Sequence, residues 1–217
     1  MKKSIYLISG LGADERVFEH LNLDNYEPKF VQWIAPTSEE TIKEYATRLS
    51  QQIETPKPII LGVSFGGMIA IEIAKQIDCE QVILISSAKT KNDIPILYQL
   101  LGKTKLHKLV PITVLKCANM LTYWFFGMET TTEKKLLKSI LTDTDRTFLR
   151  WAINAIVKWD NQDINNKIIH IHGQKDRILP ISNIRHTDFT VQDGGHLMIY
   201  NRANNINKIL NDILKIQ

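Results

Sequence analysis

Short segments of consecutive apolar residues recur along the chain, and stretches with helical spacing separate them. Apolar segments that are rich in β-branched residues and bounded by glycine, proline or polar clusters predict strands buried on both faces. The predicted strands are Ser4–Ser9, Lys29–Ile34, Ile59–Val63, Gln81–Ser86, Lys167–His172 and Thr187–Val191. Because strands and helices alternate, the pattern predicts an α/β fold: a mostly parallel sheet of about six strands, covered by helices on both faces.

Between the strands, apolar residues recur every three or four positions, which is the spacing of an amphipathic helix. One predicted helix opens at Thr37-Ser38-Glu39-Glu40, where a hydroxyl can cap the first turn, and ends before Pro56. The other predicted helices are Val17–Leu21, Phe65–Ile77, Asp145–Trp159 and Arg202–Ile216. The helix Phe65–Ile77 is apolar nearly all round, as expected of a helix with neighbours on several sides.

Residues 88–144 differ from the rest of the chain, because they have helical apolar spacing and no strand pattern. The segment is broken at Pro95, Gly102, Pro111 and Gly127, and it is too long for a simple connection. Within it, Leu109–Met128 is apolar enough to suggest a membrane span, but Lys116 would cost about 2.5 to 3.5 kcal/mol there. We therefore expect one domain, residues 1–217, with a helical cap inserted at residues 88–144 and no stable membrane insertion.

Composition narrows the class of protein. The 217 residues are 44% hydrophobic and 23% charged, which fits one globular domain with a sizeable core. The formal charge of +4 arises from scattered lysines, and the densest basic group lacks the interleaved aromatic residues of a nucleic-acid surface. That group is Lys103, Lys105, His107 and Lys108. We expect no nucleic-acid partner, and the pattern leaves the oligomeric state open.

The cysteines and the first residues bear on the compartment. Cys79 and Cys117 are isolated, with neither the spacing of a metal site nor that of a disulfide framework. The apolar run near the start is cut by Ser9 and Gly10, which leaves it too short for a convincing signal peptide and fits a first strand. The expectation is a reduced, cytoplasmic protein that needs no metal ion.

The segment Gly62-Val63-Ser64-Phe65-Gly66 joins the third predicted strand to an apolar helix. A serine on such a sharp turn is held in a strained backbone conformation with its hydroxyl exposed, and the flanking glycines let strand and helix approach each other. A five-residue match of this kind is weak by itself, and the strand before it and the helix after it strengthen it. Ser64 is therefore the candidate nucleophile.

A serine nucleophile needs a base to take its proton and an acid to orient that base. Asp176 follows the fifth predicted strand and His196 follows the sixth, while the rival acids Asp160, Asp188 and Asp193 do not lie just beyond the fifth. In a parallel sheet the carboxyl ends of strands meet at one edge, so these loops can converge with that of Ser64. His170 and His172 lie within a strand, and we interpret them as core residues.

A serine that attacks a carbonyl also needs donors for the oxyanion, each contributing about 2.7 to 4 kcal/mol in other enzymes. The backbone N–H of Phe65, at the start of the helix, is one candidate. The second is the N–H of Leu11, because Gly10 and Gly12 on either side let the backbone come close to a substrate.

With these motifs in place, the sequence resembles the α/β-hydrolase superfamily over nearly its whole length. SGLGADERVF is similar to the oxyanion loop of that family, GVSFGG to its nucleophile elbow, IHGQKDRILP to its acid loop and GGHLMIY to its histidine loop. The resemblance implies a serine hydrolase with a helical cap. The chain departs from the family in lacking an N-terminal antiparallel edge hairpin, and in having Ser9 where many members have histidine.

The expected function is hydrolysis of a carboxylic ester or thioester with a small to medium apolar acyl group, through an acyl-enzyme and without a cofactor. Tyr98, Trp124 and Phe125 are the main candidates for the acyl pocket, although aromatic residues at helical spacing are more often core. Leu101, Met120 and Phe126 are further candidates. Two alternatives stay open: a ligand-binding protein that turns over slowly or not at all, and another serine-triad reaction such as carbon–carbon bond hydrolysis.

Overall fold

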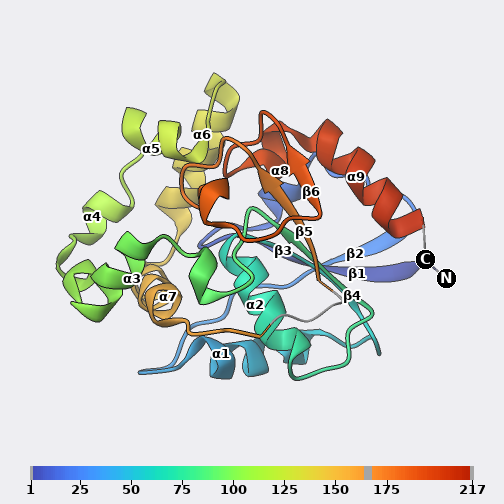
Figure 1. The fold of residues 1–217 in the computed structure, drawn as a ribbon, viewed down its shortest axis with the longest axis horizontal. Coiled ribbons are helices and arrows are strands. Elements are labelled where there is room, and N and C mark those ends of the chain that lie inside the picture. Colours follow the sequence, from blue (N-terminus) through green and yellow to red (C-terminus); the bar gives the residue numbers. More distant parts are fainter. Residues whose placement is uncertain (1, 164–167, 216–217) are drawn as a thin grey trace.

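The computed structural model describes residues 2–163 and 168–215. Its centre is one sheet of six strands in the order β2-β1-β3-β4-β5-β6, and every neighbouring pair is parallel (Figure 1). The strands are β1 (Lys3–Ile8), β2 (Tyr26–Phe30), β3 (Ile59–Val63), β4 (Gln81–Ile85), β5 (Ile168–Gly173) and β6 (Phe189–Val191). The predicted fold class, a parallel α/β sheet, is confirmed.

Helices cover both faces of this sheet. The α-helices are α1 (Ile42–Leu49), α2 (Phe65–Ala74), α3 (Ile96–Lys103), α4 (Ile112–Leu115), α5 (Met120–Phe126), α6 (Thr131–Asp143), α7 (Arg146–Lys158), α8 (Met198–Asn201) and α9 (Ala203–Lys215). Short 3-10 helices are η1 (Glu15–Phe18), η2 (Ser50–Gln52), η3 (Lys91–Asp93), η4 (Leu106–Leu109) and η5 (Ile181–Asn183).

The side chains of each strand alternate between two hydrophobic clusters, one on each face. In β1, Tyr6 and Ile8 join the cluster that includes residues of α1, α2 and α7, whereas Ile5 and Leu7 join the one that includes residues of α6, α8 and α9. The strands are apolar on both faces because both faces are covered, as the continuous apolar runs predict.

Two predicted boundaries are wrong at the β2 edge of the sheet. The second strand is Tyr26–Phe30 and not Lys29–Ile34; it contains Pro28, which an edge strand tolerates because the missing N–H faces no partner strand. Helix α1 begins at Ile42 and not at Thr37, because Thr41 forms the cap: its hydroxyl accepts the N–H of Glu44, whose carboxylate accepts the N–H of Thr41.

Smaller differences affect other elements. The predicted helix Val17–Leu21 is the 3-10 turn η1, α2 ends at Ala74 before the predicted Ile77, and β6 starts at Phe189, two residues after the predicted Thr187. The predicted first residue of β5, Lys167, and the predicted last residue of the final helix, Ile216, lie outside the described residues.

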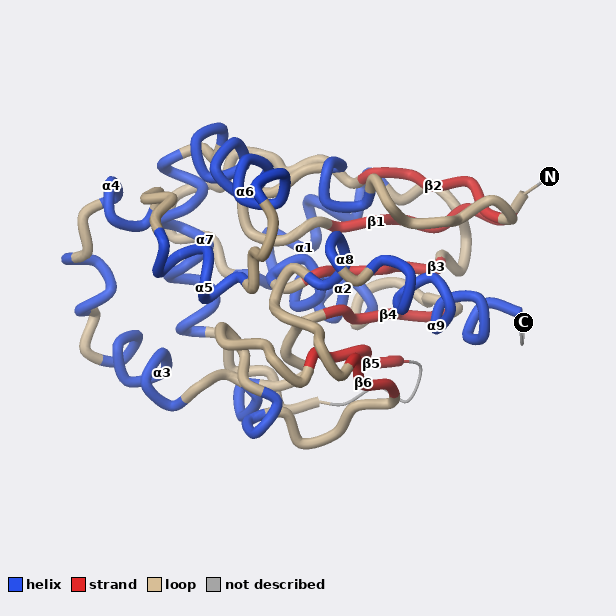
Figure 2. Tube along the Cα trace, turned by 90° about the horizontal axis from the view of Figure 1, so that it is seen from above, coloured by secondary structure: helices blue, strands red, loops and turns tan. Residues whose placement is uncertain are grey.

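Residues 88–144 contain helices and turns and no strand, as predicted. The apolar stretch Leu109–Met128 is not one helix: Pro111 precedes the four-residue α4, and Asn119 caps α5. Within the described chain, no helix has the length and apolarity to span a bilayer. Helices α3, α4 and α5 lie at one end of the molecule, far from both termini (Figure 2).

Candidate active site

Ser64 lies on the turn between β3 and α2, with a φ of 53° and a ψ of −120°. A residue with a side chain rarely adopts this conformation, which costs about 1 to 3 kcal/mol. The backbone around it holds the turn: Ser64 N–H donates to Ile85 O at 2.9 Å, and Ser87 Oγ donates to Ser64 O at 2.7 Å. The strain is therefore supported from β4 and from the loop after it.

The two glycines of the turn are required by close packing. A Cβ on Gly66 would lie 2.2 Å from Ser9 O and 2.4 Å from Ile8 O, and one on Gly62 would lie 2.5 Å from Gly66 O. These contacts are with backbone, which cannot move aside as a flexible side chain can. Glycine at both positions lets α2 start directly beside β1 and β3.

The structure brings the three predicted residues together in one hydrogen-bonded chain. His196 Nε2 is 2.9 Å from Ser64 Oγ, and His196 Nδ1 is 2.8 Å from Asp176 Oδ2. The other oxygen of Asp176 accepts the N–H groups of Ile178 and Leu179, both at 2.9 Å. The carboxylate is thus fixed by its own loop, and it fixes the imidazole in turn.

Asp176 is buried, and burial by itself would raise the pKa of its carboxyl group. The charge of His196, the hydrogen bond from its ring and the N–H of Leu179 act in the other direction and prevail, so the pKa is lowered. Asp176 is therefore ionised at neutral pH. The rivals Asp188 and Asp193 have other partners: Asp188 accepts the N–H of His170 at 2.8 Å, and Asp193 pairs with Lys175 at 2.6 Å.

The two predicted oxyanion donors come from segments beside Ser64. Phe65 is the first residue of α2, and the first N–H groups of a helix have no acceptor within that helix. The loop of Gly10 and Leu11 runs next to the serine, because a Cβ on Gly10 would lie 3.6 Å from Ser64 Cβ. Ser9 ties this loop down: its hydroxyl donates to Ala13 O at 2.6 Å and accepts Trp33 Nε1–H at 3.0 Å.

The fold resembles those of several solved structures. One is an esterase from Exiguobacterium antarcticum, with 17% identity and a TM-score of 0.73; the match covers 98% of this chain and 92% of the esterase. Another is a hydrolase from Oleispira antarctica, with 14% identity and a TM-score of 0.75; the match covers 100% of this chain and 92% of the hydrolase. An enol-lactonase from Burkholderia xenovorans LB400 is similar as well, with 16% identity and a TM-score of 0.72; the match covers 99% of this chain and 92% of the enol-lactonase. All are α/β-hydrolase fold members. This chain has the α/β-hydrolase fold. A scan against protein-family models and a search of curated proteins each find no match.

In this α/β-hydrolase fold, the predicted pocket residues take different positions. Tyr98 is half-buried against the core, and burial together with the nearby charge of Asp176 raises the pKa of its hydroxyl. Trp124 lies at the surface, and the guanidinium carbon of Arg177 stands 4.4 Å from the centre of its ring. Phe125 packs edge-on against Trp124, with 5.0 Å between the ring centres. The charge of Asp176 thus reaches the hydroxyl of Tyr98, whereas the ring of Trp124 lies at the surface.

Two further side chains lie beside the triad: Phe126, a further candidate for the acyl pocket, and His172, predicted as a core residue. Phe126 packs edge-on against the ring of His196, with 5.7 Å between ring centres, and its carbonyl accepts the N–H of Leu197. His172 Nε2 lies 3.6 Å from Asp176 Oδ2. Nothing in the sequence distinguishes Phe126 from its aromatic neighbours, and a histidine inside an apolar strand resembles any other core residue.

The buried pair His170 and His172 is held in one protonation state by its partners. Leu179 O can only accept, so His172 Nε2 carries the proton that it donates to this carbonyl at 2.8 Å. His172 Nδ1 then accepts from His170 Nε2 at 3.2 Å, which leaves His170 Nδ1 unprotonated and without a partner among the described residues. Burial lowers the pKa of both rings, that of His170 to about 3, so both are neutral at pH 7.

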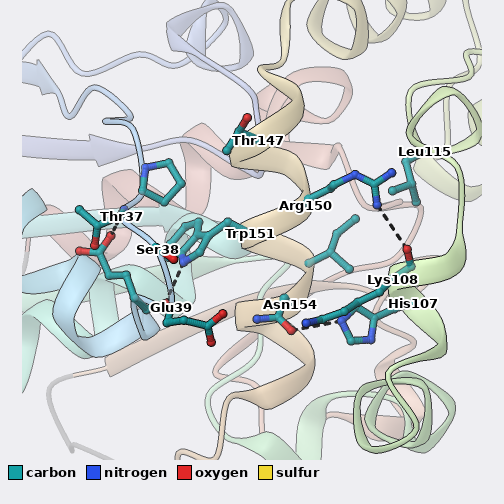
Figure 3. A pocket seen from close by; sticks show the side chains of 13 residues that line it. Thr37, Ser38, Glu39, His107, Lys108, Leu115, Thr147, Arg150, Trp151 and Asn154 are labelled. Atoms are coloured by element: carbon teal, nitrogen blue, oxygen red, sulfur yellow. Dashed lines mark hydrogen bonds between the residues drawn. The ribbon is translucent and has the colours of Figure 1, made fainter.

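A cleft of about 510 Å³ lies away from the triad, between α7, η4 and the loop before α1 (Figure 3). Arg150 reaches across it to Lys108 O at 3.4 Å, and His107 Nε2 lies 3.2 Å from Asn154 Oδ1. Its wall residue Trp151 packs edge-on against Phe65, with 6.0 Å between ring centres. This aromatic contact connects the wall of the cleft to the residue after Ser64.

Proposed function

We propose that the protein is a serine hydrolase that cleaves a carboxylic ester or thioester with a small to medium apolar acyl group. The observation that carries the proposal is the continuous hydrogen-bonded chain from Ser64 through His196 to Asp176 on a strained strand-to-helix turn. A nucleophile, a base within hydrogen-bond reach and a buried acid that orients the base are the parts that acyl transfer needs.

In the first half of the reaction, His196 Nε2 takes the proton of Ser64 while Oγ attacks the carbonyl carbon of the substrate. The carbonyl oxygen becomes an oxyanion, which the N–H groups of Phe65 and Leu11 stabilise. His196 then gives its proton to the leaving alcohol or thiol, and the acyl group stays on Ser64. Asp176 keeps the imidazole in the tautomer that accepts at Nε2 and stabilises its charged form.

In the second half, a water molecule gives a proton to His196 and attacks the acyl-enzyme through the same oxyanion. Collapse of this intermediate releases the carboxylic acid and returns the proton to Ser64. Residues 88–144 act as the cap, with Tyr98, Phe125 and Phe126 beside the acyl group. The contact of Phe126 with His196 supports this placement.

Three of the similar structures support hydrolysis as the reaction. They are named an esterase, a hydrolase and an enol-lactonase, and a lactone is a cyclic ester. Under this proposal the partner is a small-molecule ester or thioester.

The test is turnover of p-nitrophenyl esters and acyl thioesters of increasing chain length by the wild type, by Ser64→Ala and by Ser38→Ala. Ser38 is an exposed loop serine and serves as the matched control. We expect Ser64→Ala to lose at least about 10³-fold in kcat/KM and Ser38→Ala to lose none. A fluorophosphonate probe should label Ser64 alone. Equal rates of the wild type and Ser64→Ala, or a label on another residue, would overturn the proposal.

A further inference from the structure

The exposed apolar side chains of this protein gather at one end. Ten large hydrophobic residues of the described chain stand out as exposed, and nine of them fall between residues 96 and 124. We call these nine the apolar end: Ile96, Leu97, Leu100, Leu106, Leu109, Val114, Met120, Leu121 and Trp124. Leu109 is 76% exposed and Met120 87%, whereas the tenth residue, Phe30, is 42% exposed and lies on β2.

These nine residues come from four successive elements, α3, η4, α4 and α5. Helices α3, α4 and α5 lie together at the end of the molecule opposite both termini (Figure 2). Single exposed apolar residues are ordinary on a protein surface, but a gathering of this kind marks an interaction surface. The apolar end is therefore a candidate for contact with a partner or a lipid phase.

The charge of the same segment narrows the partner. Residues 94–128 contain Lys103, Lys105, Lys108 and Lys116 and no aspartate, glutamate or arginine. The chain has 27 Lys and Arg against 23 Asp and Glu, so outside this segment 23 basic residues face 23 acidic ones. The whole formal excess of positive charge thus lies within the segment that exposes the apolar side chains.

We propose that the apolar end binds the surface of an anionic phospholipid bilayer. Exposed leucine, methionine and tryptophan side chains enter the boundary between headgroups and acyl chains, while lysines beside them pair with phosphate and other anionic headgroup oxygens. Lys103, Lys105 and Lys108 are exposed and available for this, whereas Lys116 donates to Thr142 O and Thr144 O. The elements are short and separate, so they lie on the bilayer and do not cross it.

A second copy of the chain is a poorer occupant of this surface. Two apolar ends that face each other would bring lysines of the same sign together, with no acidic residue in the segment to pair with them. A bilayer that contains anionic lipid offers the opposite charge over the whole contact. Charge complementarity therefore favours the lipid surface.

Helix α5 connects this surface to the proposed active site. Its first residues, Met120 and Leu121, belong to the apolar end, whereas its last residue, Phe126, packs against His196. The carbonyl of Trp124 accepts a hydrogen bond of 2.8 Å from Nη1–H of Arg177, the residue that follows Asp176 in the sequence. If the proposed hydrolysis holds, the active site can reach esters carried in the bilayer, and these are the expected substrate class. The binding itself does not depend on hydrolysis.

The experiment is cosedimentation of the full chain with vesicles of phosphatidylcholine alone and of phosphatidylcholine with roughly one third phosphatidylglycerol, at about 50 and about 500 mM NaCl. We expect binding to the anionic vesicles at low salt, at least about tenfold weaker binding to phosphatidylcholine alone, and loss of the difference at high salt. Ser64→Ala should bind as the wild type does, which separates this result from the test of catalysis.

Three variants locate the binding. The double variant Leu109→Ser with Met120→Ser should bind at least about tenfold more weakly. Phe30→Ser, the exposed apolar residue outside the segment, should bind as the wild type does. Replacement of Lys103, Lys105 and Lys108 by glutamine should remove the preference for anionic vesicles. Circular dichroism and thermal unfolding show that each variant is folded.

Three results would overturn the proposal. The first is failure of the wild type to sediment with anionic vesicles at low salt, and the second is equal binding by the wild type and the Leu109→Ser, Met120→Ser variant. The third is a stable dimer in sedimentation velocity that the same double variant dissociates, because the apolar end would then be covered by a second copy.

Discussion

At the scale of single residues, the acid of the proposed triad has a role that a near-isosteric substitution can isolate. Asp176 accepts from His196 through one oxygen and from Ile178 and Leu179 through the other. Asparagine keeps the shape and can still accept both backbone N–H groups with its carbonyl oxygen. Its amide nitrogen then faces His196 Nδ1 and donates to it, which moves the imidazole proton to Nε2.

We therefore predict that Asp176→Asn folds as the wild type does and loses about 10⁴-fold in kcat, because a protonated Nε2 cannot take the proton of Ser64. Asp188→Asn is the control: it changes a carboxylate directly before β6, which contacts His170 N–H and Lys89. It should keep activity within a few fold. Steady-state kinetics and the melting temperature check both variants, and equal losses by the two would contradict the assignment of the acid.

The sequence predicts Ser64, Asp176 and His196 because each follows a strand in a parallel sheet, where topology alone brings loop ends together. The sequence suggests Phe126 as a pocket candidate and His172 as a core residue, but it does not predict their contacts with the triad. Their proximity to Asp176 and His196 depends on side-chain direction within a strand and within a helix of the cap segment. Neither residue type is unusual at its position, so its spacing carries no signal.

At the scale of elements, strands in the centre of the sheet were predicted within a residue, and the elements at its edge were not. The central strands β3 and β4 pair on both sides, and apart from Gln81 at the start of β4 they contain no polar side chain, so their pattern is unambiguous. The edge strand β2 pairs only with β1 and contains Pro28 and Glu27, so its sequence does not stand out from a loop. A single edge pairing leaves too weak a pattern to locate the strand.

The start of α2 offers a prediction about packing between elements. Gly66→Ala would place a methyl group 2.2 Å from Ser9 O, so α2 must shift away from β1, and overpacking of this kind typically costs about 1 to 3 kcal/mol or more. The melting temperature should fall by about 2 to 4 °C for each kcal/mol lost. Gly10→Ala is the control, because its methyl group would meet Ser64 Cβ at 3.6 Å, an ordinary contact. An unchanged melting temperature of Gly66→Ala would show that the start of α2 can accommodate a methyl group, and would contradict the prediction.

At the scale of the whole molecule, the fold separates charge and polarity along its length. The sheet lies toward the end with the termini, and helices α3, α4 and α5, which belong to the segment with the excess of lysine, lie at the other end (Figure 2). The proposed triad sits where these parts meet, at the carboxyl ends of β3, β5 and β6. The buried histidines of β5 lie in the first of these parts, where they affect the stability of the entire chain.

Neutral, buried His170 and His172 make folding sensitive to mild acid. Their pKa values are lowered in the folded chain, chiefly by burial, and the charge of Lys89 lowers that of His170 further while Asp188 opposes it. Below a pH of about 6.5 the two histidines bind protons in the unfolded chain but not in the folded chain. Their contribution to the free energy of unfolding is therefore fully present above this pH and is lost as the pH falls. Carboxylates titrate lower, near pH 4 in the unfolded chain, so the range from pH 6.5 to 5 isolates the histidines.

We predict that the free energy of unfolding falls between pH 7 and 5. His170, whose pKa in the folded chain is about 3, contributes about 2 kcal/mol to this fall, since one unbound proton costs about 1.4 kcal/mol per pH unit, and the lowered pKa of His172 adds to it. His170→Gln keeps a donor toward His172 Nδ1 and cannot titrate, so it should remove the contribution of His170. His20→Gln, which changes a histidine at the surface, should leave the fall unchanged. Urea unfolding at pH 7, 6 and 5 measures the slope. If the free energy of unfolding of His170→Gln depends on pH as steeply as that of the wild type, the prediction is wrong. The ring of His170 would then accept a proton in the folded chain, and folding would not require the neutral pair of histidines.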